Sequence, residues 1–190
     1  MLFRSPDIIL AEPVGSCTDL VATVIRPLQD IYSQPLDIAP YGVILKPSHG
    51  SRILSGKTRG GFSPQANYIF RKQIEEADFV LLNRIDELSI EEIERLSTLI
   101  AEQFEDCPVL QISAKTGAGF EKLFPWLEQQ GEFGRRVLDI DYDVYAAGEA
   151  ELGWLNCQVS LTADQTFELD SWLLGLLKRL QDEFAQSGAE

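Results

Sequence analysis

The clearest chemistry in the sequence belongs to a short polar motif, Asn83-Arg84-Ile85-Asp86, which follows the apolar run 79–82. The carboxylate of Asp86 can accept hydrogen bonds from the ring N1–H and the exocyclic amine of guanine, while the Asn83 amide braces the loop and reaches the base edge. An Asn-x-x-Asp turn also commonly does no more than cap the following helix. This motif alone therefore leaves base recognition and helix capping as two open interpretations.

A second motif, Ser113-Ala114-Lys115, follows the next apolar run and favours base recognition. The backbone N–H of Ala114 can donate to the guanine carbonyl, and the aliphatic stem of Lys115 can lie across the base plane. The two motifs stand about 27–30 residues apart, with one predicted helix between them. Strands joined in this way run parallel with a right-handed crossover, so both loops face one crevice. Together the motifs predict a purine-selective slot.

The elements that must position these loops alternate between strand and helix. Apolar runs typical of buried parallel strands cover 7–12, 42–46, 79–83 and 109–113. Helical patterns cover 18–32, 64–77, 90–104 and 120–130, with a long loop at 48–63. Pro27 is expected to kink or end the first helix, while Ser63 and the Ser89/Glu92 capping box mark helix starts. The fold class predicted is α/β, a three-layer, mostly parallel sheet.

The pattern changes after about Gly131. Residues 137–145 alternate between aspartates and apolar side chains, which is typical of a half-solvated strand. A further strand is predicted at 154–161 and a long amphipathic helix at 167–185. The sequence thus predicts two parts, a nucleotide-binding domain at 1–131 and a linker with a small α+β extension at 132–190.

Composition limits the partners and the compartment. Lys and Arg number 16 and Asp and Glu 30, a net charge of −14 that argues against nucleic-acid or anionic-membrane binding. Three cysteines and one histidine provide neither a disulfide framework nor a His-based metal cluster. The sequence has no apolar run of membrane-spanning length and no secretory signal pattern, so we expect a cytoplasmic protein.

The two loop motifs resemble those of the CobW/HypB/UreG family of GTPases, which handle nucleotides in metal-centre assembly. Asn83 and Asp86 match the family's Asn-Lys-x-Asp motif, with Arg84 in the Lys place, and Ser113-Ala114-Lys115 matches its second base-contacting loop. Glu12-Pro-Val-Gly15 resembles the family's Glu-x-x-Gly element. The resemblance covers about residues 7–130, and 138–156 is similar to the linker before the small C-terminal domain of CobW-like proteins.

The resemblance implies a P-loop NTPase-like fold that binds GTP or GDP with Mg²⁺. By this resemblance, the residues that bind the guanine base are Asn83, Arg84, Asp86, Ser113, Ala114 and Lys115. Glu12 would serve the catalytic magnesium, and Gly15 would let the switch backbone approach the γ-phosphate. The implied function is metal-centre or cobalamin-type cofactor assembly, with a metalloprotein or cofactor-assembly client as partner.

One family motif has no match. The only segment similar to the phosphate-binding loop Gly-x-x-x-x-Gly-Lys-Ser/Thr is Ser55-Gly56-Lys57-Thr58. It lacks the first glycine of the motif, because that position is occupied by Ser51. We therefore expect a truncated GTPase domain that binds GTP weakly or not at all and does not hydrolyse it. Open sheet edges would favour self-association. The alternative is a non-catalytic interaction module that uses the basic segment 46–59 or the acidic tail.

Overall fold

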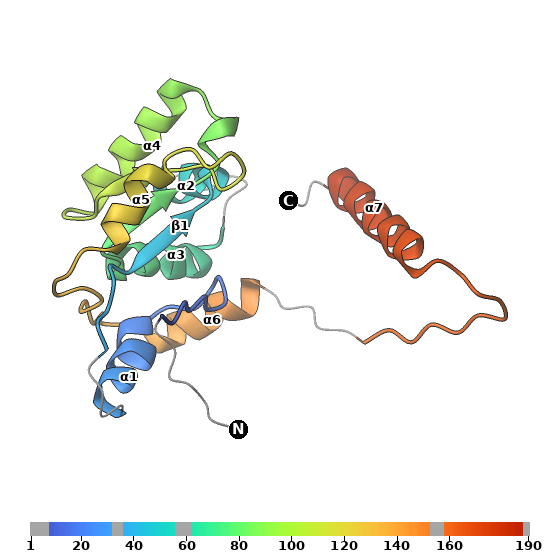
Figure 1. The fold of residues 1–190 in the computed structure, drawn as a ribbon, viewed down its shortest axis with the longest axis horizontal. Coiled ribbons are helices and arrows are strands. Elements are labelled where there is room, and N and C mark those ends of the chain that lie inside the picture. The colour runs from blue at the N-terminus through green and yellow to red at the C-terminus, as the bar shows by residue number, and fades with distance from the viewer. Residues whose placement is uncertain (1–7, 32–35, 56–61, 153–157, 188–190) are drawn as a thin grey trace. The chain divides into compact units, whose positions relative to one another are not determined.

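Among the residues that the structure describes, a parallel three-stranded sheet lies at the centre of the first of two compact units (Figure 1). The structure is a computed structural model that describes residues 8–31, 36–55, 62–152 and 158–187. Its strands pair in the order β1-β2-β3, and they are β1 (Gly42–Leu45), β2 (Phe79–Leu82) and β3 (Val109–Gln111). All three fall within predicted strands, and the α/β class is confirmed.

Helices cover the sheet, and their starts follow from local sequence. They are α2 (Pro47–Leu54), α3 (Pro64–Glu76), α4 (Ile90–Gln103) and α5 (Phe120–Leu127). The Ser63 hydroxyl caps α3 by accepting from the Ala66 N–H at 3.0 Å. Ser89 and Glu92 form the predicted capping box of α4. α2 corrects the loop expected at 48–63 over residues 48–54, because Pro47 suits a first helical position and the helix buries Ile53 and Leu54. Residues 56–61 of that expected loop lie outside the described residues.

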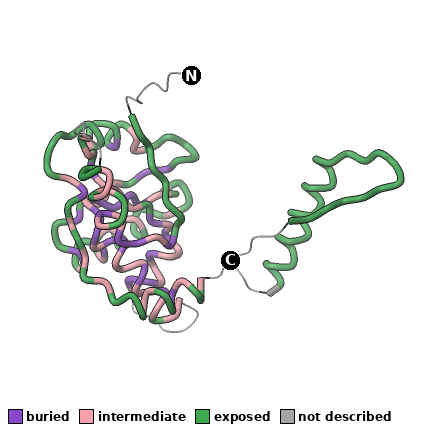
Figure 2. The backbone as a smooth tube through the Cα atoms, turned by 90° about the horizontal axis from the view of Figure 1, so that it is seen from below, coloured by how far each residue is buried: buried purple, intermediate pink, exposed green. Residues whose placement is uncertain are grey.

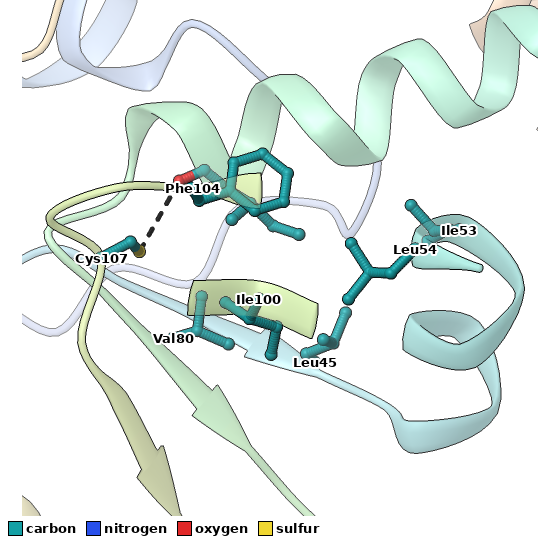
Figure 3. Packing of buried hydrophobic residues seen from close by; sticks show 8 residues of the cluster. Leu45, Ile53, Leu54, Val80, Ile100, Phe104 and Cys107 are labelled. Carbon is teal, nitrogen blue, oxygen red and sulfur yellow. Dashed lines mark hydrogen bonds between the residues drawn. The ribbon is translucent and has the colours of Figure 1, made fainter. Parts of the chain in front are cut away.

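The core lies on both faces of the sheet because β2 is buried along its whole length. Val80 points to one face, where it packs with Leu45, Ile53, Leu54, Ile74, Ile100, Phe104 and Cys107 (Figure 3). Phe79 and Leu81 point to the other face and pack with Ile112 and Leu123. Burial on both faces is what the uninterrupted apolar runs predicted.

The strand predicted at 7–12 is wrong over the described residues 8–12, which form no strand. Ile8 and Leu10 are 78% and 93% exposed, and Figure 2 colours the described segment nearest the N-terminus as exposed. The apolar pattern indicated burial, but a strand also needs a neighbouring strand to pair its backbone groups. The predicted helix that follows begins instead as a π-helix, η1 (Val21–Ile25), and continues as α1 (Arg26–Ile31), in which Pro27 is the second residue.

The strand predicted at 137–145 is also wrong, because a helix, α6 (Tyr142–Leu152), begins within it. The Asp141 carboxylate accepts from the N–H groups of Asp143 and Val144, both at 3.1 Å, and so caps the first turn. α6 packs on α3 so closely that a Cβ on Gly148 would lie 2.7 Å from the Gln65 carbonyl oxygen. The compact units accordingly divide after Gly153 rather than near Gly131.

The second unit, Trp154–Glu190, contains α7 (Leu169–Ser187), which confirms the predicted C-terminal helix. Residues 158–161 form no strand, and the rest of that prediction, 154–157, lies outside the described residues. The apolar side chains of α7 are exposed, as Figure 2 shows for this helix as a whole. Among the helices that the structure describes, none has the length and apolar character needed to cross a membrane.

Candidate functional site

Two loops meet where β2 and β3 end. Asn83 follows β2 directly, and Ser113 stands two residues beyond β3. The Ile112 N–H donates to the Leu82 carbonyl at 2.9 Å, and the Ile85 N–H donates to the Ile112 carbonyl at 3.2 Å. Since neighbouring parallel strands end at the same edge of a sheet, these bonds hold the two predicted motifs side by side.

Ser113 is the centre of the junction. Its side chain is fully buried, and its hydroxyl donates to Asp86 Oδ1 at 2.6 Å. The same hydroxyl accepts from the Thr116 N–H at 3.2 Å, and the Ser113 carbonyl accepts from the Gly117 N–H at 2.8 Å. One serine therefore shapes its own turn and fixes the Asp86 carboxylate of the other loop.

Asn83 braces both loops, whereas its motif predicted only that it braces its own. Its Oδ1 accepts from the Arg84 N–H at 2.8 Å and from the Ala114 N–H at 3.0 Å. The second bond alters one expectation, because the N–H predicted to serve the guanine carbonyl is already used by Asn83. A base can reach this donor only by sharing it with Asn83 or by displacing the amide oxygen.

The electrostatics favour an ionised Asp86. Its side chain is exposed, and the hydrogen bond from Ser113 is the main cause that lowers its pKa, with smaller contributions from the positive charges of Lys115 and Arg84. Arg84 itself has a left-handed backbone with φ 65°. Its guanidinium forms an ion pair with Glu87 at 2.7 Å, so in this structure it is directed along its own loop.

Gly119 is a site residue that the sequence motifs did not single out. It ends the turn after Ser113 with φ +83°, and a Cβ there would lie 2.1 Å from the Gln111 carbonyl oxygen. Only glycine fits such a close approach at a positive φ. The Gly-x-Gly spacing of Gly117 and Gly119, directly after the serine motif, is the signal that indicates a tight turn here.

Glu12 and Gly15 lie apart from this junction. Glu12 is exposed, in a segment without regular structure, and the Gly15 carbonyl accepts from Gln73 Nε2 at 2.9 Å on α3, the helix that precedes β2. No hydrogen bond or ion pair within the described ranges joins either residue to the two loops. Nor do any three Asp, Glu, His or Cys side chains in those ranges stand in an arrangement suited to a metal ion.

A buried polar cluster beside α3 was also missed. Glu76, fully buried, accepts from the Val21 N–H at 2.7 Å, and Tyr142 donates its hydroxyl hydrogen to Asp19. Burial raises the pKa of Glu76, and the charge of Asp19 adds to that effect. These contacts, with that of Gln73, attach residues 15–21 to α3 and α6.

Comparison of the chain with protein-family models, with curated proteins and with solved structures gave no match. The contacts between the loops after β2 and β3 are therefore the basis of the functional argument.

Proposed function

We propose that the junction of the loops at 83–86 and 113–115 binds a guanine base, as part of a GTPase of the CobW/HypB/UreG type. One observation carries the proposal: Ser113, from the loop after β3, holds the Asp86 carboxylate of the loop after β2 at 2.6 Å. The role in metal-centre or cobalamin-type cofactor assembly, with a metalloprotein client, rests on the resemblance of the motifs.

The chemistry of the junction suits guanine better than adenine. Guanine presents two adjacent donors, the ring N1–H and the exocyclic amine, and a carboxylate has two oxygens that accept such a pair. The hydrogen bond from Ser113 occupies one lone pair of Oδ1 and leaves acceptor capacity on both oxygens of Asp86. Adenine presents an acceptor at N1 and no amine at C2, so it meets the ionised Asp86 with repulsion.

The described residues give less support for binding of phosphates and magnesium than for binding of the base. GTP or GDP with Mg²⁺ is the ligand of the family that the motifs resemble, with Glu12 as the metal residue. Glu12, however, lies outside any three-residue metal-binding arrangement among the described residues. We therefore assign no catalytic step to Glu12 or Gly15.

Binding through the base alone is expected to be weak. Guanine has about a dozen heavy atoms, and a ligand gains roughly 0.3 kcal/mol per atom, so the base contributes about 3–5 kcal/mol. That range corresponds to dissociation constants near millimolar. We therefore expect this chain to bind guanine nucleotides weakly and not to hydrolyse GTP.

A titration of the isotope-labelled chain with GMP, followed through its backbone amide resonances, tests the proposal. We expect the amides of Arg84, Ala114 and Lys115 to shift with a dissociation constant near millimolar, while AMP at the same concentrations leaves them in place. Equal shifts with both nucleotides, or none with GMP at about ten times the expected constant, would contradict it.

The second candidate function is an interaction module that retains the GTPase scaffold. The observation that favours it is α7, whose apolar side chains Leu173, Leu176, Leu180 and Phe184 are all exposed. An exposed apolar face of this kind is typical of a surface that binds another protein. Of the basic segment 46–59 named in that alternative, the structure describes 46–55, where Lys46 precedes α2 and Arg52 lies in its last turn. Backbone amide spectra that do not change when GMP is added would favour this candidate.

A further inference from the structure

The outer edge of β1 has no strand beside it among the residues that the structure describes. The Tyr41 and Leu45 carbonyls accept hydrogen bonds from the chain of β2, at 2.7 Å from Asp78 and 3.2 Å from Asn83. Since backbone groups alternate sides along a strand, those of Gly42 and Ile44 face away from β2. Ile44 is also 65% exposed, while its neighbour Leu45 is buried. This edge is therefore open to a further strand.

A segment with strand-like composition lies unpaired elsewhere in the same unit. Residues 8–11 read Ile-Ile-Leu-Ala, and all four are exposed. They form no helix or strand, although the residues that follow are fixed. Ser16 donates to Glu149, and Gln73 donates to the Gly15 and Cys17 carbonyls. Residues 8–11 are thus an exposed apolar segment that is followed by residues held in place by hydrogen bonds.

We propose that residues 8–11 of one copy of this chain add to β1 of a second copy as a parallel strand, reciprocally in a closed dimer. Both segments are four residues long, and a parallel strand continues the direction of the existing sheet. In the register that places Ile8 beside Gly42, Leu10 lies beside Ile44, so the two exposed side chains share one face. The same register places Glu12 beside Lys46, which pairs opposite charges at the end of the contact.

The occupant is a second copy rather than the same chain. In the structure, residues 8–11 do not pair with the edge of their own β1, although both belong to one compact unit. An edge and a free strand in each copy allow two identical contacts per dimer, which is the self-complementary form that a two-fold axis requires. The base-binding loops lie beyond the end of β2 and take no part in the contact.

Sedimentation velocity over a range of protein concentrations tests the proposal. We expect the unaltered chain to dimerise, and Leu10→Lys and Ile44→Lys each to abolish the dimer, because each places a charge within the apolar contact. Ile90→Lys is the matched control, since Ile90 is 72% exposed at the start of α4 and lies outside the contact. Far-UV circular dichroism verifies that each variant folds.

A mixture of the two contact variants makes the test specific. Leu10→Lys retains an intact β1 edge and Ile44→Lys retains an intact strand segment, so together they can form one native contact. We expect dimers to reappear in the mixture, weaker than those of the unaltered chain. A chain that is monomeric at every concentration, a dimer that withstands both substitutions, or a mixture that stays monomeric would overturn the proposal. GMP binding is measured separately on the same variants and is expected to be unchanged.

Discussion

Two glycines in one turn provide a matched test of the site's geometry. Gly117 and Gly119 have φ +80° and +83°, so alanine at either position is held in a left-handed conformation that costs about 1–2 kcal/mol. A Cβ on Gly117 meets nothing within 4 Å, whereas one on Gly119 would lie 2.1 Å from the Gln111 carbonyl oxygen. Relieving such a clash requires the backbone to move, which costs about 1–3 kcal/mol more. The free energy of unfolding should therefore fall further for Gly119→Ala.

Urea unfolding followed by circular dichroism measures both variants against the unaltered chain. For Gly117→Ala we expect a loss of about 1–2 kcal/mol. For Gly119→Ala we expect a loss of about 2–5 kcal/mol, together with shifts of the Ser113 and Ala114 amide resonances. Equal losses for the two variants would refute the reasoning, because they would show that Gly119 does not approach the Gln111 carbonyl.

Three further predictions concern buried groups. Ser113→Ala removes the hydrogen bond that lowers the pKa of Asp86, so a carboxyl NMR titration should show this pKa move up toward its ordinary value. Burial raises the pKa of the Glu76 carboxyl group, which Glu76→Gln removes. A group with a raised pKa favours folding while it is protonated. The unfolding free energy of the unaltered chain should thus fall as pH rises from about 4.5, the ordinary Glu value, and level off above the raised pKa, whereas that of Glu76→Gln should stay flatter. Gly148→Ala should lower the unfolding free energy by about 1–3 kcal/mol, measured in urea, because its Cβ would meet the Gln65 carbonyl.

Each of these predictions has its own control. Ser97→Ala removes a hydroxyl that accepts a hydrogen bond from Gln111 away from the loops, and it should leave the Asp86 titration unchanged. If the unfolding free energy of Glu76→Gln is lower than that of the unaltered chain by the same amount at every pH, burial does not raise the pKa of Glu76. Ala147→Ser alters an exposed position next to Gly148 and should be close to neutral; if both variants are neutral, the α3–α6 contact is wrong.

Features set by neighbouring residues in the sequence were the ones that could be predicted. In the Ser63 cap and in the Ser89/Glu92 box, side chains accept hydrogen bonds from backbone N–H groups three residues away, and both features are present. β2 is a run of four apolar residues, and its burial follows from composition. The meeting of the two loops could also be predicted, because right-handed crossovers leave parallel neighbours little freedom.

Features that depend on distant partners could not be predicted. The pattern of residues 8–11 is that of a buried strand, but burial requires a neighbour that the pattern does not specify. The alternating aspartates near Asp141 indicate a strand by period, yet the Asp141 side chain caps a helix whose place is set by α3. Whether the Ala114 N–H faces a ligand or Asn83 depends on one side-chain rotamer. The position of Gly15 depends on a hydrogen bond from Gln73.

The most direct test of guanine recognition is the exchange of one atom in the carboxyl group of Asp86. Asp86→Asn can keep the contact with Ser113 through Oδ1 while replacing the other oxygen with an NH₂ donor. Xanthine has a carbonyl where guanine has the 2-amine, so amide-shift titrations should show GMP affinity falling and XMP affinity rising, each by about tenfold. Unchanged GMP affinity in Asp86→Asn would contradict the account, because it would show that this carboxylate does not contact the base.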